Sequence, residues 1–192
     1  MEKNYQDEYN RKINISLKKQ DDLIRRMEDF IAENGPHFTY LKERARARNI
    51  PVVDTDDIAY FQDINKFLTL FGLQNIVDDE DIIEQQFAVS VFNKYQTFAN
   101  ELRGVRRELL EHKIGMTRST VAAFYEIIET QRENLNIQGL DMSNRLVRKE
   151  YRHLKINSDN FIADTQADIE RMEAMIKLNE LALASLQQEK LS

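Results

Sequence analysis

A glutamate followed three residues later by a histidine is the spacing with which helical bundles hold paired metal ions. Glu150 and His153 have this spacing, whereas no glutamate stands three residues before His37 or His112. A di-metal centre needs the Glu-x-x-His pattern on each of two helices, together with further glutamates. A single pair arises by chance in a sequence this rich in glutamate. We therefore expect no metal centre and no cofactor.

Two acidic runs have the carboxylates of a calcium loop but not its spacing. Asp54, Asp56 and Asp57 lack the glycine and the final glutamate that such a loop uses. The second run, residues 78–81, reads Asp-Asp-Glu-Asp. Carboxylates stabilise the positive end of a helix dipole. Both runs therefore indicate helix starts rather than ligand sites.

The residue types on which most enzymes depend are few in this chain. The 192 residues include no cysteine and three scattered histidines, and no glycine-rich phosphate-binding motif occurs. Disulfides, thiolate metal sites and cysteine nucleophiles are therefore excluded. Acid–base catalysis needs a pocket and a base held by an orienting partner, and no pattern indicates either. We expect a non-enzymatic protein without a small-molecule substrate.

Basic residues form two groups that could contact phosphate groups or an acidic partner. The groups are Arg44, Arg46 and Arg48, and Arg145, Arg148, Lys149 and Arg152. Segment 144–155 has five basic residues and one acidic residue, a net charge of +4, which suits contact with nucleic acid. The alternative is that both groups are solvated helix faces that respond to helix dipoles. The overall charge of −6 opposes general coating of nucleic acid.

The elements that must position these residues are predicted to be helices. Glycine and proline are scarce, at 5 and 2 residues, so the chain has few places for sharp reversals. Apolar residues recur at steps of three and four, the spacing of one helix face. We expect an all-α fold, an elongated bundle of about six helices with long coiled-coil-like members and the C-terminal one partly projecting. The expected helices cover roughly 3–33, 37–48, 55–71, 78–114, 121–136 and 144–190.

Glycine, proline and capping residues define the boundaries of these helices. Asn34-Gly35-Pro36 is predicted to end the first helix, and Gly72 and Gly115 to end two others. Ser119 or Thr120 is predicted to cap the fifth. The aromatic residues of the third and fourth helices are spaced as a core rather than as an exposed stacking platform. They are Phe61, Phe67, Phe71, Phe87, Phe92, Tyr95 and Phe98.

The last expected helix has a narrow apolar stripe. From Val147 to Leu186 the stripe positions alternate in steps of three and four, as in a heptad seam that meets another helix. Residues 157–160 favour turns, so a break there is the alternative to one continuous helix. We expect residues 1–157 to form a helical bundle and 158–192 a C-terminal coiled-coil arm, either in the same domain or extending from it. The predicted partner-binding residues of this arm are Phe161, Ile169, Met172, Ile176, Leu183 and Leu186.

These features favour a structural or assembly protein: an adaptor, scaffold or connector subunit of a larger oligomeric particle, acting through helix–helix packing. Small helical, cysteine-free subunits of virions have a similar profile, which is an analogy of type. Two other classes fit as well, a regulatory or inhibitory module that binds a protein and a nucleic-acid-binding protein that uses a basic end.

The expected location follows from what the chain lacks. The N-terminal residues have no apolar core of a secretory signal, and no run approaches the roughly 18 apolar residues of a membrane span. We expect a homo- or hetero-oligomer that is cytoplasmic or incorporated in a macromolecular particle.

Overall fold

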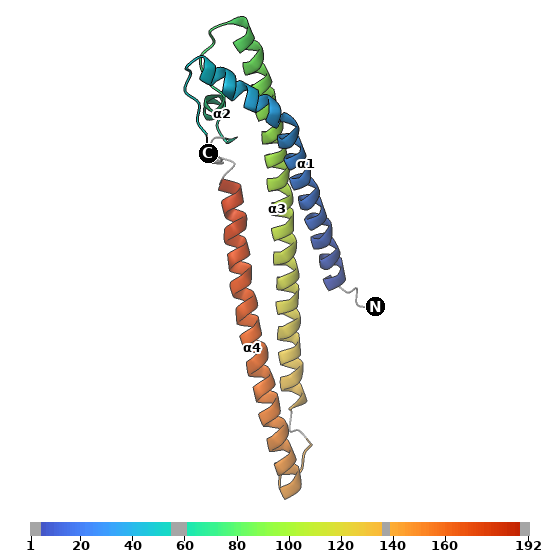
Figure 1. Cartoon of the computed structure of the whole chain (residues 1–192). Coiled ribbons are helices and arrows are strands. Elements are labelled where there is room, and N and C mark those ends of the chain that lie inside the picture. Colours follow the sequence, from blue (N-terminus) through green and yellow to red (C-terminus); the bar gives the residue numbers. More distant parts are fainter. Residues whose placement is uncertain (1–4, 55–60, 136–138, 189–192) are drawn as a thin grey trace. The chain divides into compact units, whose positions relative to one another are not determined.

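The all-α prediction is confirmed. The computed structural model describes residues 5–54, 61–135 and 139–188, and these contain four α-helices and no strand. The helices are α1 (Tyr5–Ala47), α2 (Ile64–Leu70), α3 (Asp79–Asn134) and α4 (Arg145–Gln188) (Figure 1). Within this described part, every helix lacks an apolar stretch that could span a bilayer.

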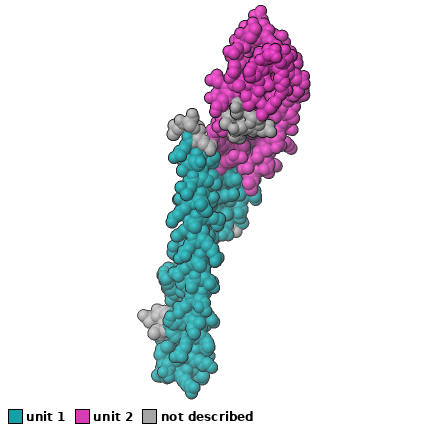
Figure 2. All heavy atoms as spheres, turned by 60° about the vertical axis from the view of Figure 1, so that its left-hand side comes forward, with its two compact units in different colours: residues 1–16, 107–192 teal, residues 17–106 magenta. Residues whose placement is uncertain are grey.

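The chain divides into two compact units (Figure 2). Unit 1 contains residues 1–16 and 107–192, and unit 2 contains residues 17–106. Because the boundaries fall inside α1 and α3, each of these helices contributes to both units. The residues predicted as a C-terminal arm belong to unit 1, together with the second half of α3.

The first helix continues through the sequence predicted to end it. Asn34-Gly35-Pro36 lies inside α1, although a proline in a helix removes one hydrogen bond and costs about 3 kcal/mol relative to alanine. Packing on both sides of the proline offsets this cost. Phe38 stacks on Phe71 with ring centroids 4.4 Å apart, and Phe30 packs against the same core. The predicted helices 3–33 and 37–48 are therefore one helix.

The prediction of a helix end at Gly115 and a new cap at Ser119 or Thr120 is also wrong. α3 is continuous from Asp79 to Asn134. The Thr120 hydroxyl does not cap a new helix, because it donates backward to the Met116 carbonyl at 3.1 Å, a bond that an unbroken helix accommodates. A glycine inside a helix costs only about 1 kcal/mol. With these two mergers, the six predicted helices become four.

In the described part of the predicted helix 55–71, α-helical structure starts only after Asp63. The Asp63 carboxylate caps α2 by accepting the backbone N–H groups of Asn65 and Lys66 at 2.8 and 3.1 Å. The predicted cap at Thr55-Asp56-Asp57 lies outside the described residues. The predicted end at Gly72 is confirmed, since Gly72 has a φ of 68°, a left-handed conformation that favours glycine.

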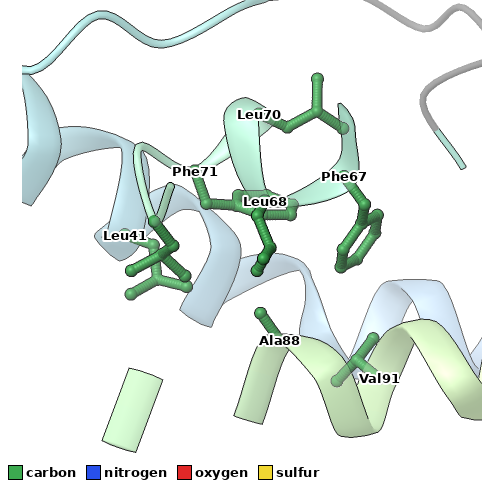
Figure 3. Packing of buried hydrophobic residues seen from close by; sticks show 8 residues of the cluster. Leu41, Phe67, Leu68, Leu70, Phe71, Ala88 and Val91 are labelled. Atoms are coloured by element: carbon green, nitrogen blue, oxygen red, sulfur yellow. The ribbon is translucent and has the colours of Figure 1, made fainter. Parts of the chain in front are cut away.

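Unit 2 is built around an aromatic and aliphatic core (Figure 3). Phe67 of α2 is 1 % exposed, and its ring lies 5.1 Å from that of Phe71 and 5.4 Å from that of Phe92, between centroids. The buried residues of the cluster are Leu41, Phe67, Leu68, Leu70, Phe71, Leu73, Ala88 and Val91. The predicted core role of the aromatic residues is thus confirmed, and burial of each large apolar side chain contributes roughly 1.5–3 kcal/mol.

Unit 1 contains an antiparallel pair formed by the second half of α3 and α4. Arg118 of α3 pairs with Glu180 of α4 at 2.5 Å, and the Tyr125 hydroxyl donates to Glu173 at 3.3 Å. Seven residues forward on α3 therefore correspond to seven residues back on α4. α4 is also unbroken through 157–160, so the predicted alternative of a break there is wrong.

The stripe that α4 presents to α3 differs from the predicted stripe at two positions, Leu154, which is 62 % exposed, and Phe161. Ser158, Thr165 and Ile169 are buried as expected. Phe161, however, is 46 % exposed, and Ile162 packs in its place against the cluster shared with α3. The observed series 158, 162, 165, 169, 172 and 176 keeps steps of four and three.

Candidate functional site

The first group of basic residues is neutralised within unit 2. Arg48 contacts Asp81 at 2.7 Å and Asp78 at 2.8 Å, and Arg44 contacts Asp81 at 3.0 Å. Arg46 pairs with Asp54. Each of the three predicted anion-binding arginines therefore already has a carboxylate partner, from 8 residues away in the chain for Arg46 and Asp54 to 37 residues away for Arg44 and Asp81.

The carboxylates that hold Arg44 and Arg48 also start α3. Asp78 accepts the backbone N–H of Asp81 at 2.9 Å, and Asp81 in turn accepts the backbone N–H of Asp78 at 3.3 Å. This reciprocal arrangement is a capping box built from two aspartates. The interpretation of residues 78–81 as a helix start is confirmed.

Asp81 is held in its charged form although its surroundings are largely closed to water. Burial by itself would raise the pKa of the Asp81 carboxyl, but the Val77 N–H, the Arg48 guanidinium and the Asp78 N–H together keep that pKa below its ordinary value. The site therefore stabilises one negative charge inside unit 2.

Two further contacts continue this polar face of α1 toward α3. His37 meets Glu84 at 2.6 Å, and the Tyr40 hydroxyl donates to Glu80 at 3.0 Å. Residues 37, 40, 44 and 48 follow the three- and four-residue spacing of one helix face. This face joins the end of α1 to the start of α3, which makes it a structural contact rather than a free binding surface.

The second group of basic residues is exposed in unit 1. Arg145, Arg148, Lys149 and Arg152 lie on the first two turns of α4, and the described residues provide no carboxylate partner for any of them. At 3.6 residues per turn the four side chains leave the helix within an arc of about 100°. We call this surface the basic face.

The basic face lies where α4 has least support from α3. Continuing the register of the Arg118–Glu180 and Tyr125–Glu173 pairs places Asn134, the last residue of α3, about level with Asp164. The first turns of α4 therefore extend past the end of α3 (Figure 1). No acidic side chain offsets their positive charge in the first turn of α4.

Most of the predicted partner-binding seam is used inside unit 1. Ile169 is 3 % exposed in a cluster with Val121 and Ile128, and Met172 and Ile176 pack against that cluster. Leu183 and Leu186 are half-buried. Among the six predicted residues, only the Phe161 side chain is largely exposed.

An apolar flank remains exposed beside this seam. Leu154, Phe161 and Met175 are 62 %, 46 % and 51 % exposed, and Leu178 is 66 % exposed. The first three lie at multiples of seven residues, so they form a line along α4. Sequence reasoning missed this flank as a separate surface. Leu154 and Phe161 belong to the predicted main stripe, so the signal that could have found a second surface is limited to Met175 and Leu178, which fall outside that stripe.

The Glu150–His153 pair is not part of a cluster of ligands. Both side chains are exposed on α4, and among the described residues no three histidine, aspartate or glutamate side chains converge as a metal site requires. Unit 2 does have a cavity of about 180 Å³. Its lining is mainly aromatic, including Phe30, Phe38 and Tyr95, so it offers packing rather than chemistry.

Comparison of the chain with known protein families, with curated proteins and with solved structures finds no match.

Proposed function

We propose that this chain is a non-enzymatic assembly protein that associates with a second copy of itself through the exposed apolar flank of α4. The observation that carries this proposal is the line Leu154, Phe161 and Met175, whose large apolar side chains remain exposed at separations of 7 and 14 residues. Aligned apolar side chains on a helix gain free energy when a second helix covers them.

The pattern along this line supports a copy of the same chain as the occupant. Asp168 lies midway between Phe161 and Met175, seven residues from each. In an antiparallel pairing with a two-fold axis at Asp168, Phe161 of each copy meets Met175 of the other. An interface of this symmetry requires a self-complementary surface, and a sequence that reads apolar, acidic, apolar at equal spacing provides one.

The charges at the centre are compatible with the same pairing. Two aspartates brought together at an axis repel each other, but Arg171 already contacts Asp168 at 2.9 Å. Both residues are exposed, so the arginine of one copy can also reach the aspartate of the second. The centre would then contain two cations and two anions.

The test is the mass of the intact chain in solution, measured by light scattering over a range of concentrations. We expect a dimer, and we expect Phe161→Ser with Met175→Ser to give a monomer with unchanged helical circular dichroism. The matched control replaces two other exposed apolar residues of unit 1, Ile15→Ser and Ile127→Ser, and should remain dimeric. A monomer at every concentration would overturn the proposal, and so would loss of the dimer in the control alone.

The regulatory alternative uses the same flank with a different protein. It would give a monomeric chain that gains mass only when its partner is added, so the same measurement separates the two functions.

A further inference from the structure

We propose that the basic face, Arg145, Arg148, Lys149 and Arg152, binds the phosphate backbone of a nucleic acid. This site is independent of the apolar flank, and it would operate whether the chain is a monomer or a dimer.

The first argument is that the charge of this face is not balanced within the described chain. Arg44, Arg46 and Arg48 each have carboxylate partners in unit 2, whereas the four cations of the basic face have none among the described residues. Only Lys155, the next basic residue on α4, has a partner, Asp159 at 2.8 Å.

The second argument is that these cations lie at an electrostatically unfavourable place. The N-terminal end of a helix carries a partial positive charge, so arginines there are destabilised rather than stabilised by the dipole. Four like charges within two turns also repel one another. Glu150 is the single acidic residue of this segment, and it projects outside the arc of the four cations. A ligand that supplies several negative charges at once would relieve both effects.

The dimensions and residue types fit a polyphosphate. From Arg145 to Arg152 the helix rises roughly 10 Å, a length over which duplex DNA carries about six phosphate charges. Three of the four residues are arginines, whose planar guanidinium binds phosphate oxygens through two parallel hydrogen bonds. We therefore expect contacts with the backbone and no preference for base sequence.

The structure favours a nucleic acid over a lipid surface. A membrane-surface helix inserts the apolar side opposite its cations. On α4 the exposed Leu154 and Phe161 of the apolar flank do lie on that side, but the charged Glu150 lies on it as well. At its edge Tyr151 is half-buried, with its hydroxyl 3.4 Å from the Leu135 carbonyl, and Ser158 is buried. A side interrupted in this way offers no continuous apolar surface for insertion. Leu146 and Ile156 are exposed near the cations, but they lie about 80° apart around the helix and nearly three turns apart along it, so they form no continuous apolar surface.

The experiment measures binding of a fluorescently labelled duplex DNA to the intact chain by anisotropy, at several salt concentrations. For about four phosphate contacts the logarithm of the association constant should fall with the logarithm of salt concentration with a slope of about −3 to −4. The variant R145Q/R148Q/K149Q/R152Q should bind at least tenfold more weakly at low salt and show a slope near zero.

Two control variants keep this test decisive. Replacing four exposed cations elsewhere, R11Q/K18Q/K66Q/K177Q, changes the net charge equally and should leave the slope unchanged. Replacing the three arginines of the basic face by lysine retains charge and should retain most of the slope, which separates lost charge from lost folding.

Three outcomes would overturn the proposal. The first is that the chain binds neither duplex DNA, nor single-stranded DNA, nor RNA, even at low salt. The second is that DNA binding weakens equally in the glutamine variant and in its charge-matched control. The third is that the chain binds phosphatidylserine vesicles but no nucleic acid. Light scattering on the same samples gives the mass of the chain and so tests the assembly proposal separately from nucleic-acid binding. The two proposals can fail independently, because the basic face and the apolar flank share no residue.

Discussion

Asp81 combines two roles in one carboxylate. One oxygen accepts backbone N–H groups from Val77 and Asp78, which completes the cap of α3, and the other accepts from Arg48. The side chain is buried, so its charge depends on these donors rather than on water. Asp81 therefore links the end of α1 to the start of α3, together with the contacts made by Asp78, Glu80 and Glu84.

We predict that Asp81→Asn, which keeps the shape of the side chain and removes its charge, lowers the free energy of unfolding at pH 7 by about 1.5–3 kcal/mol, the range for hydrogen bonds to charged groups. The exposed neighbour Asp79→Asn should cost only about 0.3–1 kcal/mol, as expected for a first-turn carboxylate acting on the helix dipole. Denaturant unfolding followed by circular dichroism measures both. Equal losses for the two substitutions would contradict the dual role of Asp81.

The difference in stability between the wild-type chain and Asp81→Asn should depend on pH, because the pKa of Asp81 is lowered in the folded chain. A carboxylate with a depressed folded-state pKa adds stability that is fully present above its ordinary pKa, near 4, and is lost as the pH falls through the folded value. The gap between the wild-type chain and Asp81→Asn should therefore narrow as the pH is lowered below about 4.

The helices show how packing overrides local signals. Gly104 and Gly115 both lie inside α3, but their surroundings differ. A Cβ added at Gly104 would meet no atom within 4 Å, whereas one at Gly115 would lie 2.8 Å from Cε1 of Tyr9. Gly115 is therefore the position at which the first part of α1 approaches α3 in unit 1, and Gly104 has no such role.

We predict opposite outcomes for alanine at these two glycines. Gly104→Ala should stabilise the chain by up to about 1 kcal/mol, because alanine is the better helix former. Gly115→Ala should give no gain or a loss, since the Tyr9 ring must move. The measurement is the change in the free energy of unfolding for each variant.

The control for Gly115 is a double-mutant cycle with Tyr9→Ala. In that background Gly115→Ala should recover the gain seen at Gly104. If Gly115→Ala stabilises the wild-type chain as much as Gly104→Ala does, the contact with Tyr9 is not the reason for the glycine.

At the scale of the whole chain, each unit has buried clusters of its own. The core of unit 2 is centred on Phe67, and that of the α3–α4 pair in unit 1 is centred on Ile169. Phe67 and Ile169 belong to different clusters of buried residues, although α3 contributes side chains to both. Local stability should therefore differ between the units.

We predict that Phe67→Ala and Ile169→Ala destabilise different parts of the chain. Deletion of a buried phenylalanine costs about 3–5 kcal/mol and of a buried isoleucine about 2–5 kcal/mol. Hydrogen exchange measured by mass spectrometry should accelerate most within residues 17–106 for Phe67→Ala and within 107–188 for Ile169→Ala. A uniform acceleration over all helices for both variants would show that the units unfold as one.

The helical class, the aromatic core and most of the α4 stripe could be predicted from the sequence because they depend on short-range periodicity. Phe67 and Phe71 lie four residues apart, and Ile169, Met172 and Ile176 recur at steps of three and four. A residue spacing of this kind fixes which side chains share a helix face without knowledge of the neighbour. The two basic groups were also visible as local runs of charge.

The tertiary structure decided which of these charged and apolar residues have partners inside the protein and which remain exposed. Arg48 and Arg152 have equivalent signals in the sequence, but Arg48 meets Asp81, 33 residues away, and Arg152 meets no carboxylate in the described chain. Likewise, Pro36 and Gly115 are local stop signals, and the helices pass through them because packing against distant segments outweighs costs of about 1–3 kcal/mol. Pairings between residues far apart in the chain leave no local pattern, which is why only the folded structure identifies the free basic face and the free apolar flank.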